Sequence, residues 1–245
     1  MLSLVLGLVT GSFLNVVIYR MPRAESILSP PSHCPVCLHR LGIADLIPVL
    51  SYLWLRGRCR YCSTPISVMY PLLEIVTGLV FWLAFIQYGW SAQWVVAAVF
   101  GALLIACAGI DLQFKIIPDR LTLPGMVLGL VLAMVGFGPG IITSILGVLA
   151  LGGLLLLLGV VFTGGMGGGD IKMGAMMGAF LGPGMAMVAL VIASLIGAVI
   201  GLILIMLKKR DRQEGIAFGP FLAIGGIVAL LYGNAAVNWY LGIWM

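Results

Sequence analysis

Charged side chains are scarce in this 245-residue chain. Asp, Glu, Lys and Arg make up 9% of it, and only eight residues are acidic. A soluble globular domain carries about 25% charged and about 45–50% apolar residues, whereas this chain is 62% hydrophobic and has a mean hydropathy of +1.20. The composition excludes a soluble globular domain and indicates an integral membrane protein, in which 34 glycines favour closely packed transmembrane helices.

The uncharged stretches predict an all-α membrane protein with about eight transmembrane helices. A helix needs about 20 apolar residues to cross the hydrocarbon layer, and Gly/Pro breaks divide the longer stretches. The predicted spans lie near 1–19, 68–88, 92–110, 121–136, 140–163, 172–181, 184–207 and 217–240. Because the sixth span is short, a single bent helix over 172–207 is the alternative.

The net charge of +5 comes from 13 Lys and Arg, which in a membrane protein report topology more often than a nucleic-acid partner. With eight spans, all of them fall on one side of the membrane. The positive-inside rule then places both termini outside and every basic loop in the cytoplasm. A single helix over 172–207 would put the basic cluster 208–212 outside, which favours eight spans.

One polar stretch, 20–67, is long enough to form a small domain. The expected division is therefore a first transmembrane helix over 1–19, a cytoplasmic four-cysteine domain over 20–67 and a polytopic membrane domain over 68–245. The first segment resembles a signal peptide, but its positive charges follow it. We therefore expect it to remain in the membrane as a helix.

Two CxxC pairs, Cys34 with Cys37 and Cys59 with Cys62, lie in this polar stretch. Their spacing is close to that of a zinc ribbon, in which four thiolates surround one Zn²⁺. A domain of roughly 48 residues is too small for a sufficient core, and the cytoplasm disfavours disulfides. We predict a structural zinc site, because four thiolates leave no open coordination position; a redox pair is the lesser alternative.

Two aspartates, Asp111 and Asp170, lie at the cytoplasmic ends of predicted spans. Ionisable groups beside spans are costly and point to function. Two carboxylates that share a water can hydrolyse a peptide bond, one as general base and the other, protonated, polarising the carbonyl. The preceding Gly167, Gly168 and Gly169 permit bending and close approach of a substrate backbone. The sequence therefore favours a catalytic dyad.

Other polar residues near the spans have simpler explanations. Pairing with Lys115 or Lys172 would explain either aspartate alone, but not both together with the glycine run. Asp119 follows Pro118 and precedes a span, so we expect a structural role as a helix N-cap. Glu74 lies about one or two turns inside a span; a loop arginine, a substrate amine and the headgroups are equally open as its partner.

The motifs and their order resemble those of type IV prepilin peptidases over essentially the whole chain. They are Gly11-Ser-Phe-Leu-Asn-Val-Val-Ile-Tyr-Arg-Met-Pro22, the two CxxC pairs, Tyr70-Pro-Leu-Leu-Glu74, the segment from Asp111 to Ile117-Pro-Asp119, Gly167-Gly-Gly-Asp170-Ile-Lys172 and Gly219-Pro-Phe-Leu222. The resemblance implies an intramembrane aspartic endopeptidase of the GxGD type, with Asp111 and Asp170 as its catalytic pair. Such an enzyme removes the basic leader from prepilins and pseudopilins at the cytoplasmic face of the bacterial inner membrane.

The same resemblance implies a second activity. Family members with the cysteine loop typically also methylate the new N-terminal residue with S-adenosylmethionine, so we expect both activities. Glu74, Asn15 and Arg20 are candidates for methyltransferase or substrate contacts, although no nucleotide-binding fingerprint defines that site. The expected partners are these substrates and the lipid bilayer, with no nucleic acid; the sequence leaves the oligomeric state undefined.

Several alternatives remain open at this point. The chain could be a peptidase only, or an ion-coupled transporter whose Asp111 and Asp170 bind a cation. It could also be a membrane-anchored zinc module that docks a partner, or a GxGD protease of the presenilin type. The cysteine loop argues against the transporter, and the lack of a Pro-Ala-Leu segment argues against the presenilin type.

Overall fold

The computed structural model describes residues 1–162 and 166–207 and the backbone of 217–244. Within these residues every regular element is a helix and no strand is present, so the predicted all-α fold is confirmed. Five of the described helices are long and apolar enough to cross a membrane. The basic cluster 208–212, on which the topology argument partly depends, lies outside the described residues.

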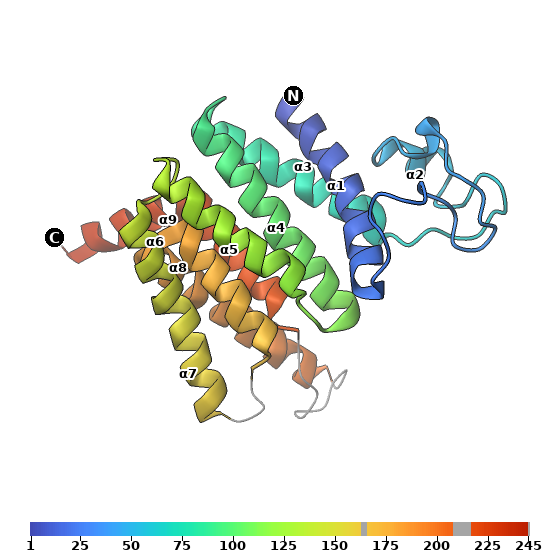
Figure 1. Ribbon diagram of the computed structural model, residues 1–245. Helices are drawn as coiled ribbons and strands as arrows, with labels where there is room; N and C mark the ends of the chain where they lie inside the picture. The colour runs from blue at the N-terminus through green and yellow to red at the C-terminus, as the bar shows by residue number, and fades with distance from the viewer. Residues whose placement is uncertain (163–165, 208–216, 245) are drawn as a thin grey trace. The chain divides into compact units, whose positions relative to one another are not determined.

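The contacts divide the chain into two compact units, Met1–Trp94 and Val95–Met245. In the first unit α1 and α3 lie side by side and run antiparallel (Figure 1). Ser3 near the start of α1 donates a 2.7 Å hydrogen bond to the carbonyl of Phe81 near the end of α3. The elements of this unit are α1 (Leu2–Arg20), η1 (Met21–Arg23), η2 (Ile43–Asp45), α2 (Leu50–Trp54) and α3 (Met69–Tyr88).

The second unit is a helical bundle that begins within α4. Its elements are α4 (Ala92–Phe114), α5 (Asp119–Met134), α6 (Ile141–Gly147), η3 (Val148–Gly152), α7 (Gly153–Val161), α8 (Gly168–Met206) and α9 (Gly219–Trp244). The segment η3 is a π-helix that joins α6 to α7, and together the three form one span over Ile141–Val161. The backbones of this span and α8 touch at Gly147 and Gly178, where a Cβ on either residue would lie 2.1 Å from the other's carbonyl oxygen.

Helix α8 consists of two helical segments joined at a break. An unbroken helix of 39 residues would extend roughly 58 Å at 1.5 Å per residue, about twice the thickness of the hydrocarbon core. Gly182, just before Pro183, instead has a non-helical backbone with φ 71° and ψ 174°, which a residue with a side chain rarely adopts. The predicted Gly-Pro break is therefore confirmed, and the fold is consistent with eight spans.

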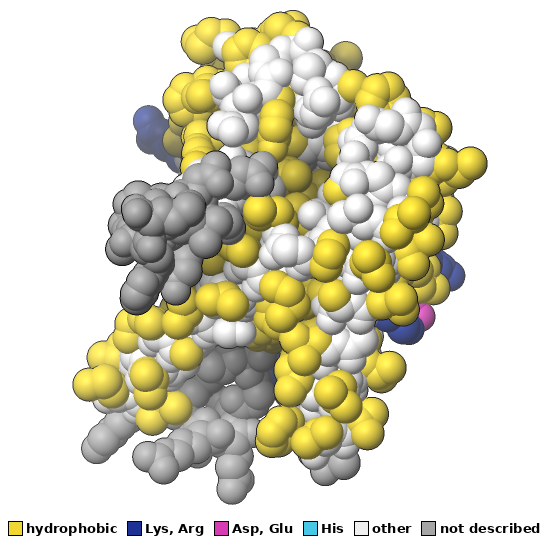
Figure 2. Space-filling model, turned by 90° about the vertical axis from the view of Figure 1, so that its left-hand side faces the viewer, with side chains coloured by type: hydrophobic (Ala, Val, Ile, Leu, Met, Phe, Trp, Pro, Cys, Tyr) yellow, Lys and Arg dark blue, Asp and Glu magenta, His cyan; other side chains and the backbone are white. Residues whose placement is uncertain are grey.

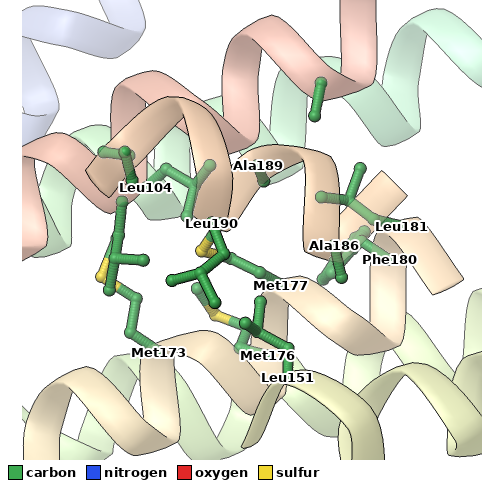
Figure 3. Close-up of a cluster of buried hydrophobic side chains, with 14 of the residues drawn as sticks. Leu104, Leu151, Met173, Met176, Met177, Phe180, Leu181, Ala186, Ala189 and Leu190 are labelled. Carbon is green, nitrogen blue, oxygen red and sulfur yellow. The ribbon is translucent and has the colours of Figure 1, made fainter. Parts of the chain in front are cut away.

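Buried side chains from both halves of α8 belong to the same core. Figure 3 shows Met173, Met176 and Met177 from the first half beside Leu190 from the second half. Phe180 stacks on Phe100 of α4 with ring centroids 4.7 Å apart. This core fixes the first turn of α8, which carries Asp170.

Much of the molecular surface is apolar. Figure 2 shows one face on which hydrophobic side chains predominate and charged side chains gather at the margins. Large exposed hydrophobic residues of α7, such as Leu157, Val160 and Val161, are 58–66% exposed. Such a surface fits contact with lipid, as expected of a multi-pass membrane protein.

Candidate active site and metal centre

Asp111 lies in the last turn of α4 and is only 6% exposed. Its Oδ2 accepts a 2.9 Å hydrogen bond from the backbone N–H of Gly219, the first residue of α9. The first N–H groups of a helix have no intrahelical acceptor and carry partial positive charge. The start of α9 is therefore an electrostatically favourable neighbour for this carboxylate.

Asp170 is the third residue of α8 and has a different environment. Its Oδ1 is buried and has no hydrogen-bond partner among the described residues. Its carboxylate is close enough to Asp111 for an electrostatic interaction. A buried polar atom without a partner costs about 1–3 kcal/mol, so Oδ1 is available for a water or a substrate.

Ile117, in the connection between α4 and α5, lies between the glycines beside the two aspartates. A Cβ on Gly219 would lie 3.0 Å from Ile117 Cδ1 and 2.7 Å from Asp111 Oδ2. A Cβ on Gly169 would lie 2.8 Å from Ile117 Cβ. The structure thus brings together Asp111, the glycine run before Asp170 and the start of α9, although they are far apart in sequence.

The lysine pairings considered from the sequence are not formed. The ammonium of Lys172 bonds both carboxylate oxygens of Asp119, at 2.7 and 2.6 Å. Among the described residues Lys115 forms no ion pair with Asp111. The prediction that Asp119 caps α5 is wrong, because Pro118 occupies the cap position and no side-chain capping bond is made; the nearby ammonium binds both carboxylate oxygens instead.

Three polar residues of the first unit, singled out from the sequence, are buried and bonded to backbone. Glu74 Oε2 accepts a 2.7 Å bond from the N–H of Val49, and Asn15 donates to the carbonyl of Tyr70 over 3.1 Å. The guanidinium of Arg20 donates to loop carbonyls, among them that of Pro30 at 2.7 Å. Among the described residues Glu74 forms no ion pair with a loop arginine. The bonds of these three residues tie the cysteine loop and the two helices together.

The four cysteines form two matching turns. In the first, Cys34 N–H donates to the carbonyl of His39, and in the second, Cys59 N–H donates to that of Thr64, at 3.0 and 2.8 Å. The residue that follows each CxxC pair has a positive φ, 58° at Leu38 and 59° at Ser63. Two such turns present four sulfur atoms towards one point, so the repetition of the CxxC pairs extends to the backbone around them.

The four sulfur atoms of Cys34, Cys37, Cys59 and Cys62 lie within 4.8 Å of one another, and none forms a disulfide. The Sγ atoms of Cys34 and Cys62 are 3.8 Å apart. A tetrahedral site with Zn–S bonds of about 2.3 Å has sulfur–sulfur edges of about 3.8 Å. The cluster therefore fits a single metal ion held by four thiolates.

Hydrogen bonding favours the thiolate form of two of the four cysteines. Contacts with the side chain and backbone of Thr64 lower the pKa of Cys62 to about 6, and a backbone bond from Cys37 lowers the pKa of Cys34. Although the His39 backbone acts in the opposite direction, loss of solvation and the adjacent sulfur atoms raise the pKa of Cys37 to about 11. A bound cation would relieve this crowding of sulfur atoms.

A further link, which was not anticipated, joins the second cysteine turn to η2. Asp45 accepts bonds from Arg60 at 2.6 Å, from Tyr61 at 3.2 Å and from the Gly42 N–H at 3.1 Å. Burial alone would raise the pKa of Asp45, but the Arg60 guanidinium holds it below its ordinary value. The sequence signal for this link was weak, because Asp45 is one of two acidic residues among six arginines in the loop.

Comparisons with known proteins cover most of the chain. The bacterial peptidase A24 N-terminal domain matches residues 5–88, and the type IV leader peptidase family matches residues 98–202. The chain is similar to proteins named prepilin leader peptidase/N-methyltransferase, over 96–98% of its own length and 91–96% of theirs. Identity is 38% for Aeromonas hydrophila, 37% for Neisseria gonorrhoeae and 36% for Bacillus subtilis.

No solved structure matches the chain. The matches follow the two units closely, since one family domain falls within Met1–Trp94 and the other within Val95–Met245. The resemblance inferred from the motifs is confirmed by relatives of nearly equal length. This chain belongs to the type IV leader peptidase family, within the group of prepilin leader peptidase/N-methyltransferases.

Proposed function

We propose that this protein cleaves the leader peptide from type IV prepilins and pseudopilins, with Asp111 and Asp170 as its catalytic pair, and then methylates the new N-terminal residue. The observation that carries the cleavage site is the pair of neighbouring carboxylates in one unit. Asp111 accepts the Gly219 N–H, whereas Asp170, whose carboxylate is bonded by the Gly167 backbone, keeps a buried Oδ1 without a partner among the described residues. The names of the relatives support both activities.

The difference between the two carboxylates suggests a role for each. The Gly219 N–H stabilises negative charge on Asp111, so Asp111 would be the ionised general base that removes a proton from the attacking water. Asp170 would be protonated and would donate a hydrogen bond to the scissile carbonyl oxygen, stabilising the charge that develops there. Asp111 would then return the proton to the leaving amine as the C–N bond breaks.

The glycines before Asp170 would leave room for the substrate backbone. A Cβ at Gly168 would meet no atom within 4 Å, so there is open space beside the catalytic residue. Gly167 lies close to Asp170, with a Cβ position 3.2 Å from Oδ2. An extended peptide could approach Asp170 here without contacting side chains, and we propose that backbone flexibility at these glycines helps to admit it.

Methylation would use S-adenosylmethionine as the methyl donor, as the names of the relatives suggest. The fit of Glu74, Asn15 and Arg20 to this donor is poor, because each is buried and bonded within the first unit. We therefore assign them a supporting role in shaping that unit. No step of methyl transfer is derived from them.

We propose that the metal at the four cysteines is Zn²⁺ with a structural role, because four thiolates close the coordination shell. The cysteine segment 20–67 would face the cytoplasm as a small domain between the helix over 1–19 and the membrane domain over 68–245. Six arginines in this segment and the positive-inside rule support that orientation. The active site would then face the cytoplasm of a bacterial inner membrane.

The test is to incubate the purified protein in detergent with a type IV prepilin and S-adenosylmethionine, and to measure the intact mass of the pilin. Loss of the leader with the gain of one methyl group is expected. Leader loss without methylation would leave a peptidase only. A prepilin that stays intact would refute the proposal and favour the ion-coupled transporter, whose activity would require a gradient.

A further inference from the structure

The cysteine loop carries an exposed apolar surface that neither the active site nor the metal centre uses. Leu50, Leu53 and Trp54 of α2 are 61, 64 and 86% exposed. We call these residues, together with the exposed apolar side chains that precede them, the α2 patch: Ile43, Leu46, Ile47, Leu50, Leu53 and Trp54. An exposed apolar group of this kind marks a surface that contacts a partner or a membrane.

One hydrogen bond fixes the position of the start of α2 along the axis of α3. The N–H of Val49, the residue directly before α2, donates to Glu74 Oε2 over 2.7 Å. Glu74 is five residues beyond Met69, the first residue of α3, which places it about 8 Å along the helix axis. Helix α3 is long and apolar enough to cross a membrane, and α2 begins at the level of its first turns.

The backbone at Val49 is held in an unusual conformation. Its φ of 62° and ψ of −50° are rare for a β-branched residue. Such a conformation persists only where the surroundings favour it, and the buried Glu74 carboxylate supplies an acceptor for this N–H. The start of α2 is therefore attached to α3 by a hydrogen bond.

Charge next to α2 complements a lipid surface. Arg56 and Arg58 follow α2 directly and are exposed. Basic side chains beside an apolar helical face are typical of segments that lie in the membrane interface, where anionic headgroups attract them. Trp is also enriched at the boundary between headgroups and acyl chains.

We propose that the α2 patch inserts into the bilayer interface on the side where α3 begins, with Arg56 and Arg58 among the headgroups. Three observations carry the proposal: the hydrogen bond of Val49 to a spanning helix, the exposed Leu and Trp side chains, and the adjacent arginines. Cys59 follows α2 closely, so the anchor would hold the metal centre at the membrane surface. The inference does not depend on the proposed catalytic activity.

The fluorescence of Trp54 can report directly whether the α2 patch lies in lipid or in water. The full-length protein and the Trp54→Phe variant would be placed in nanodiscs of phosphatidylcholine and phosphatidylglycerol, with or without lipids brominated near the top of the acyl chains. The difference between their emission spectra isolates Trp54. We expect brominated lipid to remove most of this difference emission, and aqueous iodide to remove little of it.

A second variant tests the patch as a whole. In Leu53→Asp the charge should move α2 away from the acyl chains, so that the Trp54 emission shifts to the red and becomes accessible to iodide. Helix content measured by circular dichroism checks that each variant is folded. If iodide quenches Trp54 in the unmodified protein while brominated lipid does not, or if protection appears only after a prepilin is added, the patch faces water or binds substrate and the proposal is wrong.

Discussion

The backbone N–H of Gly219 donates a 2.9 Å hydrogen bond to Oδ2 of Asp111, although the two residues are 108 positions apart in the chain. The bond attaches the first residue of α9 to the last turn of α4. Asp170 differs in that its buried Oδ1 has no donor among the described residues, although the Gly167 backbone bonds its carboxylate. The contact therefore explains the glycine of the Gly-Pro-Phe-Leu motif at the start of α9, because its N–H binds Asp111.

This bond predicts that Gly219→Ala impairs cleavage. A Cβ would lie 2.7 Å from Asp111 Oδ2, so the carboxylate has to move by several tenths of an ångström or more. Misplacement of a catalytic group by about 1 Å costs on the order of 100-fold in rate, and we expect kcat for prepilin cleavage to fall by up to that factor. Gly153→Ala is the matched control, because its Cβ would meet nothing within 4 Å. Equal cleavage rates for Gly219→Ala and the control would contradict the role of this contact.

Substitution of either aspartate should greatly reduce cleavage without abolishing methylation. Asp111→Asn and Asp170→Asn are each expected to reduce cleavage by about 100- to 10,000-fold, because each removes a proton-transfer group. An amide oxygen at position 111 can still accept the Gly219 N–H, so the fold should survive. The measurement is the mass of a prepilin after incubation, with a pilin already lacking its leader as the methylation control. Normal cleavage by either variant would exclude the dyad, and loss of methylation as well would indicate a wider defect.

The two glycines directly before Asp170 should respond differently to substitution by alanine: Gly169 should be sensitive and Gly168 tolerant. A Cβ at Gly169 would lie 2.8 Å from Ile117 Cβ and 3.3 Å from the backbone of that residue, whereas one at Gly168 would meet nothing within 4 Å. We expect Gly169→Ala to lower thermal stability by about 1–3 kcal/mol through overpacking, and to reduce cleavage. Gly168→Ala should leave the melting temperature unchanged. Similar melting temperatures for the two variants would show that Ile117 moves aside easily.

Removal of the metal should unfold the cysteine segment. The protein is expected to bind one zinc ion, measured by mass spectrometry of metals, and a chelator should abolish protease resistance of the segment because binding and folding are coupled. Cys37→Ser should lower the zinc content. Cys107→Ala should not, because Cys107 lies in α4 and is not one of the four clustered cysteines. Full metal content in Cys37→Ser would mean that the four sulfur atoms do not share one ion.

Much of the fold follows from local sequence signals. Runs of apolar residues define the spans, and Gly182 before Pro183 marks the break in α8 because few other pairs interrupt a helix so strongly. The spacing of the cysteines likewise predicts their convergence, since each CxxC turn places two sulfur atoms on one side. The expectation that Asp111 and Asp170 lie at similar depth on the same face followed from the predicted topology.

Contacts between distant segments were not predictable in the same way. The N-cap prediction for Asp119 used a local rule, but the ammonium of Lys172, on another helix, binds both of its oxygens. The partner of Glu74 is a backbone N–H of the loop, a donor that every residue except proline carries and that no sequence pattern identifies. Such pairings depend on how helices meet in space.

The break at Gly182 also decides which part of α8 meets the lipid. Between 171 and 181 the side chains are largely buried, apart from that of Lys172, which is 42% exposed, whereas exposed side chains recur after the break. The half that carries Asp170 is thus enclosed by other helices of its unit, and the second half meets the acyl chains. Changes in bilayer thickness tilt or shift lipid-facing helices. They would therefore act on the second half of α8 and have little effect on the position of Asp170.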